Sequence, residues 1–324
     1  MRYLAYFLLF GFLVTSCKTD NKKIATPEIK KDPVKIPAFN ANNAYNYIEK
    51  QLSFGTRIPG TETHKACKDW IVSEMKSLGA EVIEQDFTAN IYNGEKWAST
   101  NIICHINPDL MNRVLLSAHW DSRFIADNDP DATKHDEPVM GADDAGSGVS
   151  ILMEIANIIK QNPIDLGVDI IFWDAEDQGD SGGASDTWCL GSQHWSRNKH
   201  DKNYTAKFGI NLDMVGAKNP VFGKDEISRQ YAGTYLNKFW TLGQRMGYND
   251  IFVDKSVGGL TDDHVFVNRY AKIPMFDVVN HDGKTFQKCW HTHCDDLSVI
   301  DKRTLRSVGQ VVTAALYKES TGHF

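Results

Sequence analysis

The chain has 324 residues, of which 42% are apolar and 24% are charged, and its formal net charge at pH 7 is −7. This size and composition are those of a globular protein with one large core or two small ones. The negative charge argues against a nucleic-acid partner, and the one basic stretch, KKIATPEIKKDPVK, is typical of a solvated linker.

The N-terminal segment predicts export. Arg2 precedes an apolar run from Leu4 to Val14, which is too short to cross a bilayer as a helix. The following VTSC resembles a bacterial lipobox, which implies a signal peptide at 1–16, cleavage before Cys17 and lipidation of its thiol. We therefore expect an exported bacterial lipoprotein, held by its lipid to a membrane of the periplasm or cell envelope. A plain signal peptide with an incidental cysteine is the alternative.

Residues 17–38 are predicted to be a flexible tether, and two helices follow it. Asn40 and Thr61 are good helix caps, and each begins a segment with apolar residues at helical spacing. We expect the first helix to end near Gln51 and the second at Gly79. Between them, FGTRIPGT is a glycine- and proline-containing turn.

The rest of the chain alternates between strands and helices. Segments 82–91 and 97–106 alternate in polarity around an Asn-Gly pair, which predicts a hairpin. Four apolar runs follow, and helical patterns separate them. The runs are VLLSAHWD, VDIIFWDAED, FGINLDMVG and IPMFDVVN, and the helical patterns cover 146–161, 229–246 and 302–317. Buried strands alternating with helices indicate a three-layer α/β/α sandwich with a mixed, mostly parallel sheet, which we expect as one domain over 39–324.

Side chains that can bind a metal stand at the ends of these runs, where open α/β sheets place their ligands. They are His119, Asp121, Asp143, Asp144, Glu176, Asp177, Asp213, Asp262, Asp263 and His291. Each acidic residue alone is more often merely solvated. Together with an imidazole they form a nitrogen and oxygen donor set suited to Zn²⁺ or another borderline divalent ion. The adjacent Glu176 and Asp177 can diverge, one to the metal and one to the reacting group as general base. Residues 124–140 are expected to form an exposed loop nearby.

Seven segments carry a more specific resemblance. They are FGTRIPGTETHKACKDWI, SAHWDSR, GADDAGSG, FWDAED, LDMVGA, TDDHVF and CWHTH. Their order and spacing resemble those of the glutaminyl-peptide cyclotransferases, or glutaminyl cyclases, of the zinc-aminopeptidase-like superfamily. The similarity runs from about Asn40 to Phe324. FGTRIPGT and the DDH segment are the most particular to cyclases, whereas the metal-binding residues are shared with the wider superfamily.

The resemblance implies a catalytic domain that converts the N-terminal glutamine of peptides and proteins to pyroglutamate and releases ammonia. It implies one catalytic Zn²⁺ with an open fourth position. The implied roles are zinc ligands (Asp144, Asp177, His291), a general acid/base and the carboxylates bonded around it (Glu176, Asp213, Asp262), and pocket indoles (Trp290, Trp188). The chain departs from the animal enzymes with Asp177 in place of Glu and Asp277 in place of His.

A two-zinc aminopeptidase of the same fold is the alternative. His119 and Asp213 stand where those relatives hold a second metal, with Asp144 bridging, and Glu176 would then activate a water. Every side chain that this chemistry needs is present, so counting ligands does not separate the two activities. Asp121 is expected to orient His119 or a loop rather than to bind the catalytic zinc. A catalytically inactive binding module is a third possibility, but no ligand or base is missing.

The hexapeptide CWHTHC at 289–294 first suggests a self-contained metal site. Four ligands so close together would need a tight reversal, and no glycine or proline is present to make one. An extended trace would instead place Cys289, His291 and His293 on one side. Since the carboxylates supply the other ligands, we expect only His291 to bind zinc. Without Cys17 the cysteines are odd in number, and Cys289 and Cys294 either pair or stay free.

Overall fold

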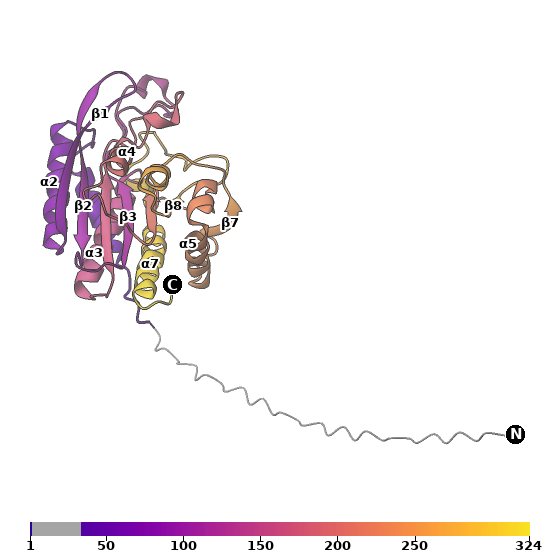
Figure 1. Ribbon diagram of the computed structural model, residues 1–324. Coiled ribbons are helices and arrows are strands. Elements are labelled where there is room, and N and C mark those ends of the chain that lie inside the picture. Colours follow the sequence, from indigo (N-terminus) through magenta and orange to yellow (C-terminus); the bar gives the residue numbers. More distant parts are fainter. Residues whose placement is uncertain (2–33) are drawn as a thin grey trace. The chain divides into compact units, whose positions relative to one another are not determined.

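A six-stranded mixed sheet forms the middle layer of the protein in this computed structural model, which describes Met1 and residues 34–324 (Figure 1). Its strands are β1 (Glu81–Asn90), β2 (Lys96–Ile106), β3 (Arg113–His119), β4 (Gly167–Trp173), β5 (Gly209–Asp213) and β8 (Met275–Val279). They lie in the order β1-β2-β4-β3-β5-β8. β2 runs antiparallel to both neighbours, whereas β4, β3, β5 and β8 are parallel. The predicted mixed, mostly parallel sheet is confirmed.

Helices cover both faces of this sheet. One face shares a core with α1 (Ala41–Leu52), α2 (Glu62–Ser77), α3 (Gly146–Gln161), α5 (Glu226–Arg245) and α7 (Lys302–Ser320). The other packs against α4 (Leu190–Arg197) and the π-helical turn Val267–Ala271. Successive residues of β2 divide between the cores, because neighbouring side chains on a strand point to opposite faces. Ile102 and Cys104 join the first core and Ile103 the second. The three-layer architecture is confirmed.

The local signals for turns and helix ends act as expected. Asn40 accepts hydrogen bonds from the N–H groups at the start of α1, and Thr61 does so for α2. Gly94 adopts a positive φ of 92° at the hairpin between β1 and β2, a conformation that costs glycine little. β3, β4 and β8 are buried at every position, which is why their sequences are continuously apolar.

Helix α5 begins three residues earlier than predicted because Asp225 caps it. The buried Asp225 carboxylate accepts a hydrogen bond from the Ser228 N–H at 2.6 Å and lies 3.0 Å from Nε2 of His264. Burial alone would raise the pKa of Asp225. The hydrogen bond and charge of His264, with the backbone N–H donors, outweigh burial and lower that pKa to about 2.

Several short elements were not predicted, because none is long enough to show a periodic pattern. They are α6 (Asp263–Phe266), a separate parallel pair of β6 (Phe222–Lys224) with β7 (Phe252–Ser256), and 3₁₀ turns at Ala132–Lys134, Ser185–Thr187 and Leu297–Val299.

One expectation about local structure is wrong. Residues 289–294 are not extended, because Thr292 N–H bonds to the Cys289 carbonyl and His291 adopts a positive φ of 56°. The chain thus reverses without glycine, and Cys289 and Cys294 are joined by a disulfide. Residues 124–140 form a largely exposed loop, as expected, in which Ala126 and Val139 are buried.

The predictions about export fall largely on residues that the structure does not describe. The signal peptide at 1–16, Cys17 and most of the tether at 17–38 lie outside the described residues. Residues Val34–Phe324 form one compact unit. Within the described residues, no helix combines the length and the apolar character needed to cross a membrane.

Candidate active site

A cavity of about 240 Å³ opens where the carboxyl ends of the parallel strands meet. All eight residues proposed from the sequence for zinc, catalysis and the pocket wall line it. They are Asp144, Glu176, Asp177, Trp188, Asp213, Asp262, Trp290 and His291. His119 and Asp121 lie beneath them at the end of β3. The structure thus brings these side chains together at one edge of the sheet.

Asp144, Asp177 and His291 form a candidate cation site. One donor atom of each lies within 4.8 Å of the others, and all three residues are buried. Nε2 of His291 is 2.9 Å from Oδ1 of Asp177. Oδ2 of Asp177 is buried and has no hydrogen-bond partner in the described part of the chain. Such an oxygen is costly to bury unless it binds something. One imidazole and two carboxylates fit Zn²⁺ with a position left open.

Asp127, which sequence reasoning missed, orients the imidazole of His291. Its Oδ1 lies 3.1 Å from Nδ1 of His291. The Arg123 guanidinium in turn donates to Asp127 from Nε at 2.8 Å and from Nη2 at 2.7 Å. A carboxylate that holds one ring nitrogen leaves the other free to bind a metal, and this pairing is common for histidine ligands. No local pattern marks Asp127, which is 164 residues from His291.

Glu176 lies at the cavity wall with its backbone held by Asp121. The Asp121 carboxylate accepts from the N–H groups of Glu176 and Asp177, each at 3.1 Å, so it orients the loop after β4 as expected. The Cys189 thiol, also missed, donates to Oε1 of Glu176 at 3.1 Å. Burial raises the pKa of Glu176 well above its ordinary value; His119 opposes this, and the charges of neighbouring aspartates add to it.

A second group of carboxylates lies behind Glu176. Asn211 donates from Nδ2 to Oδ1 of Asp262 at 2.9 Å and to Oδ1 of Asp277 at 3.3 Å. Burial and the charges of nearby carboxylates raise the pKa values of Asp213 and Asp277 well above the ordinary range, with His119 opposing this at Asp213. Burying these carboxylates together therefore favours a shared proton on the group.

His119 brings the possible second metal set together. Its Nε2 lies 2.9 Å from Asp144 and 3.3 Å from Asp213, and the three donors form another compact group. Burial alone would lower the pKa of His119, but its hydrogen bonds to Asp121, Asp144 and Asp213 raise it. The arrangement that a two-zinc aminopeptidase would use is thus present beside the first site.

Aromatic side chains make the apolar wall of the cavity. The centroid of the Trp290 ring lies 3.9 Å from that of His291, and Trp188 stacks on His291 with its ring centroid at 5.8 Å. The Arg123 guanidinium covers Trp188 at 4.7 Å from the ring centroid. The two indoles give the cavity an apolar wall, which suits the methylene chain of an amino-acid side chain.

Two further residues that sequence reasoning did not assign hold the backbone of the site. Asp295 accepts from the N–H groups of Asp143 at 2.8 Å and Asp144 at 3.2 Å. The buried Arg57 of FGTRIPGT donates to three backbone carbonyls, from Nε to Trp120 at 2.8 Å, Nη1 to Met140 at 2.9 Å and Nη2 to Gly141 at 2.6 Å. Arg57 lies within the FGTRIPGT segment, but a sequence does not show which carbonyl groups a guanidinium will reach.

Residues 101–316 match the model of peptidase family M28. Because this match covers more than half of the chain, the protein belongs to peptidase family M28. The expected zinc-aminopeptidase-like fold is confirmed, and zinc is the metal associated with this family.

Comparison with individual proteins gives more specific similarities than the family match. The crystal structure of Porphyromonas gingivalis glutaminyl cyclase is 42% identical with a TM-score of 0.85, covering 87% of this chain and 99% of that one. A Zn-dependent exopeptidase from Parabacteroides distasonis ATCC 8503 is 44% identical with the same TM-score and coverage. Aminopeptidase YwaD of Bacillus subtilis (strain 168) is 29% identical over 65% of this chain, which spans only 41% of that protein. The resemblance to glutaminyl cyclases is confirmed.

Proposed function

We propose that this protein is a zinc-dependent glutaminyl-peptide cyclotransferase, which converts the N-terminal glutamine of peptides and proteins to pyroglutamate and releases ammonia. One observation carries the proposal. The candidate zinc ligands, Glu176 and two indoles line a single small cavity in a chain 42% identical to a glutaminyl cyclase over nearly its whole length. In this proposal Asp144, Asp177 and His291 hold one Zn²⁺.

The bound zinc supplies Lewis acidity toward the γ-amide carbonyl of the substrate glutamine. The α-amine attacks the γ-carbonyl carbon of the same residue, so the reacting atoms are already joined by the substrate chain. The new C–N bond closes a five-membered ring, and the bond to the amide nitrogen breaks. Glu176 takes a proton from the attacking nitrogen and delivers it to the departing nitrogen, which leaves as ammonia.

Neighbouring side chains prepare Glu176 for this transfer. The Cys189 thiol donates a hydrogen bond to Oε1 of Glu176, so Oε2 is the oxygen left to exchange a proton with the substrate in this proposal. Because its pKa is raised, Glu176 is suited to hold the proton while it passes from the attacking nitrogen to the departing nitrogen. Trp188 and Trp290 line the cavity and exclude water, which would otherwise hydrolyse the amide.

The two-zinc aminopeptidase is the second candidate, because His119, Asp144 and Asp213 form a compact donor group. Ammonia release separates the two. We expect the purified protein to release ammonia from a peptide that begins with glutamine. A chelator should stop this release, and one equivalent of zinc per chain should restore it. Two tightly held zinc ions with hydrolysis of amino-acid amides would overturn the proposal.

We also infer that the protein is exported as a lipoprotein and anchored to a membrane through Cys17. VTSC at the end of the apolar run supports this inference, and the Cys289–Cys294 disulfide is consistent with an oxidising compartment. The test is metabolic labelling with a fatty-acid analogue. Label on the wild type that is absent from Cys17→Ala is expected; equal label on both would contradict lipidation at this residue.

A further inference from the structure

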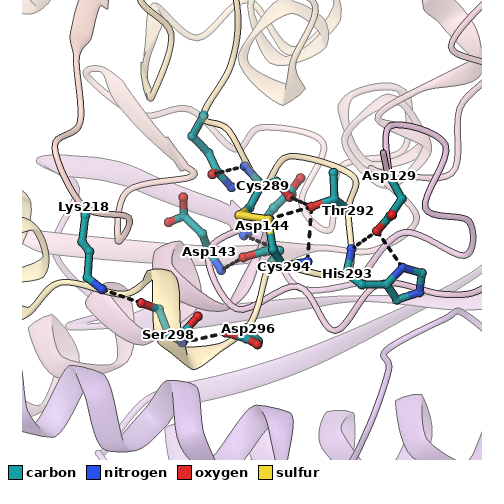
Figure 2. Close-up of a disulfide and its surroundings, with 12 residues drawn as sticks. Asp129, Asp143, Asp144, Lys218, Cys289, Thr292, His293, Cys294, Asp296 and Ser298 are labelled. Atoms are coloured by element: carbon teal, nitrogen blue, oxygen red, sulfur yellow. Dashed lines mark hydrogen bonds and ion pairs between the residues drawn. A yellow bond between two sulfur atoms is a disulfide. The ribbon is translucent and has the colours of Figure 1, made fainter. Parts of the chain in front are cut away.

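The disulfide between Cys289 and Cys294, which Figure 2 shows, closes a short loop. His291 is one of the four residues between the two cysteines. We propose that this bond is a positioning element of the zinc site, which fixes the loop carrying His291 relative to Asp144. The proposal rests on the zinc site proposed above. It assigns to the cysteines of CWHTHC a role toward the metal without making either sulfur a ligand.

The loop has a backbone conformation that needs outside support. His291 adopts a φ of 56°, in the left-handed region that residues with a Cβ rarely enter. Such conformations persist only where the surrounding structure fixes them. Inside the loop, Thr292 donates from Oγ1 to the Cys289 carbonyl at 3.0 Å and accepts from the Cys294 N–H at 3.3 Å (Figure 2). These bonds and the disulfide join the same two ends.

Each end of the disulfide is held by neighbouring residues. On one side, Cys289 is buried and its N–H donates to Oε1 of Gln287 at 2.7 Å. On the other side, Cys294 is followed by Asp295, whose buried carboxylate accepts from the N–H groups of Asp143 and Asp144. Figure 2 shows Asp143 and Asp144 beside the disulfide. The bond therefore links the start of the His291 loop to Cys294, the residue directly before Asp295, which holds the backbone of another proposed zinc ligand.

This linkage has a direct consequence for metal binding. With the bond intact, the imidazole is held 2.9 Å from Asp177 before any metal arrives. With the bond broken, the two ends of the loop lose their cross-link, and the Thr292 hydrogen bonds, the contacts of the His291 ring with Asp127 and Asp177 and the hydrogen bond from the Asn128 N–H to the His291 carbonyl are left to hold the backbone at His291. Loss of such supporting contacts lowers metal affinity about 10- to 100-fold. Because Cys294 is solvent-exposed, a reductant can reach the bond.

The experiment compares zinc affinity in four forms of the full chain, by competition with a chromophoric chelator. The forms are wild type, wild type after reduction and thiol capping, the double variant Cys289→Ser/Cys294→Ser, and Cys67→Ala as a control that removes a buried thiol outside the site. We expect at least about 10-fold weaker zinc binding in the reduced protein and in the double variant, with native circular dichroism. Reductant should not change the double variant, and Cys67→Ala should bind zinc as the wild type does.

Unchanged zinc affinity in the folded double variant would overturn the inference, as would a loss fully explained by its unfolded fraction. If that variant does not fold, faster zinc release from native wild type after reduction supports the inference, and an unchanged rate overturns it. Ammonia release at saturating zinc is measured in parallel. Tight zinc binding that depends on the disulfide, without ammonia release, would contradict the cyclase proposal and still support this inference.

Discussion

Asp127→Asn should weaken zinc binding although Asp127 is not itself a proposed ligand. Burial alone would raise the pKa of Asp127, but the hydrogen bonds of His291 and Arg123 lower it far below its usual range, so the residue is ionised under all working conditions. Asparagine keeps the shape and one acceptor. It places an N–H₂ donor against the Arg123 guanidinium and removes the charge that holds Nδ1 of His291 at 3.1 Å.

The expected loss is about 10- to 100-fold in zinc affinity, or about 1.4–2.7 kcal/mol. Competition with a chelator measures it, and the unfolding midpoint of the metal-free protein shows whether the fold is intact. Asp131→Asn is the matched control, because Asp131 lies in the same loop and its side-chain carboxylate accepts from Thr133. Wild-type affinity in Asp127→Asn, or an equal loss in Asp131→Asn, would refute the role assigned to Asp127.

Three further predictions follow from the geometry. Glu176→Gln should lower kcat for ammonia release about 10²- to 10⁴-fold with zinc content unchanged, and a smaller loss in kcat would exclude Glu176 as the proton carrier. In Gly179→Ala, the new Cβ would lie 2.1 Å from Trp188. The displaced indole should raise KM about 2- to 10-fold with kcat largely kept; an unchanged KM would exclude Trp188 from the pocket. Asp225 stabilises the fold fully above about pH 4 and loses this effect as pH falls toward its folded pKa of about 2. Urea unfolding of Asp225→Asn should therefore show about 2 kcal/mol less stability at pH 6 and a difference that shrinks below pH 4; a constant difference would contradict the assignment.

Much of the fold was predictable because its signals are local. The caps at Asn40 and Thr61 act on residues two or three positions away, and the buried strands are visible in the sequence as apolar runs. The site was predictable for a related reason. Parallel strands end at one edge, so residues that follow different strands, such as Asp177 and Asp213, meet there without any direct sequence relation.

The supporting contacts were not predictable, because they join residues that no local pattern connects. Asp295 reaches the backbone of Asp143 and Asp144 across about 150 positions, and Asp127 reaches His291 across 164. The reversal at CWHTHC was missed for a different reason. Steric rules assign left-handed backbone to glycine, and only the disulfide and contacts from other segments make that conformation acceptable for His291.

The buried Arg57 bears on where this protein can be divided. The family match begins at residue 101, yet Arg57 lies well before it and pairs with the carbonyls of Trp120, Met140 and Gly141 inside it. A fragment cut at that boundary would retain every proposed ligand and still leave three carbonyl groups without their partner. Arg57 therefore supports the backbone of the active site from outside the matched region, and a fragment that keeps these three hydrogen bonds must begin upstream of it.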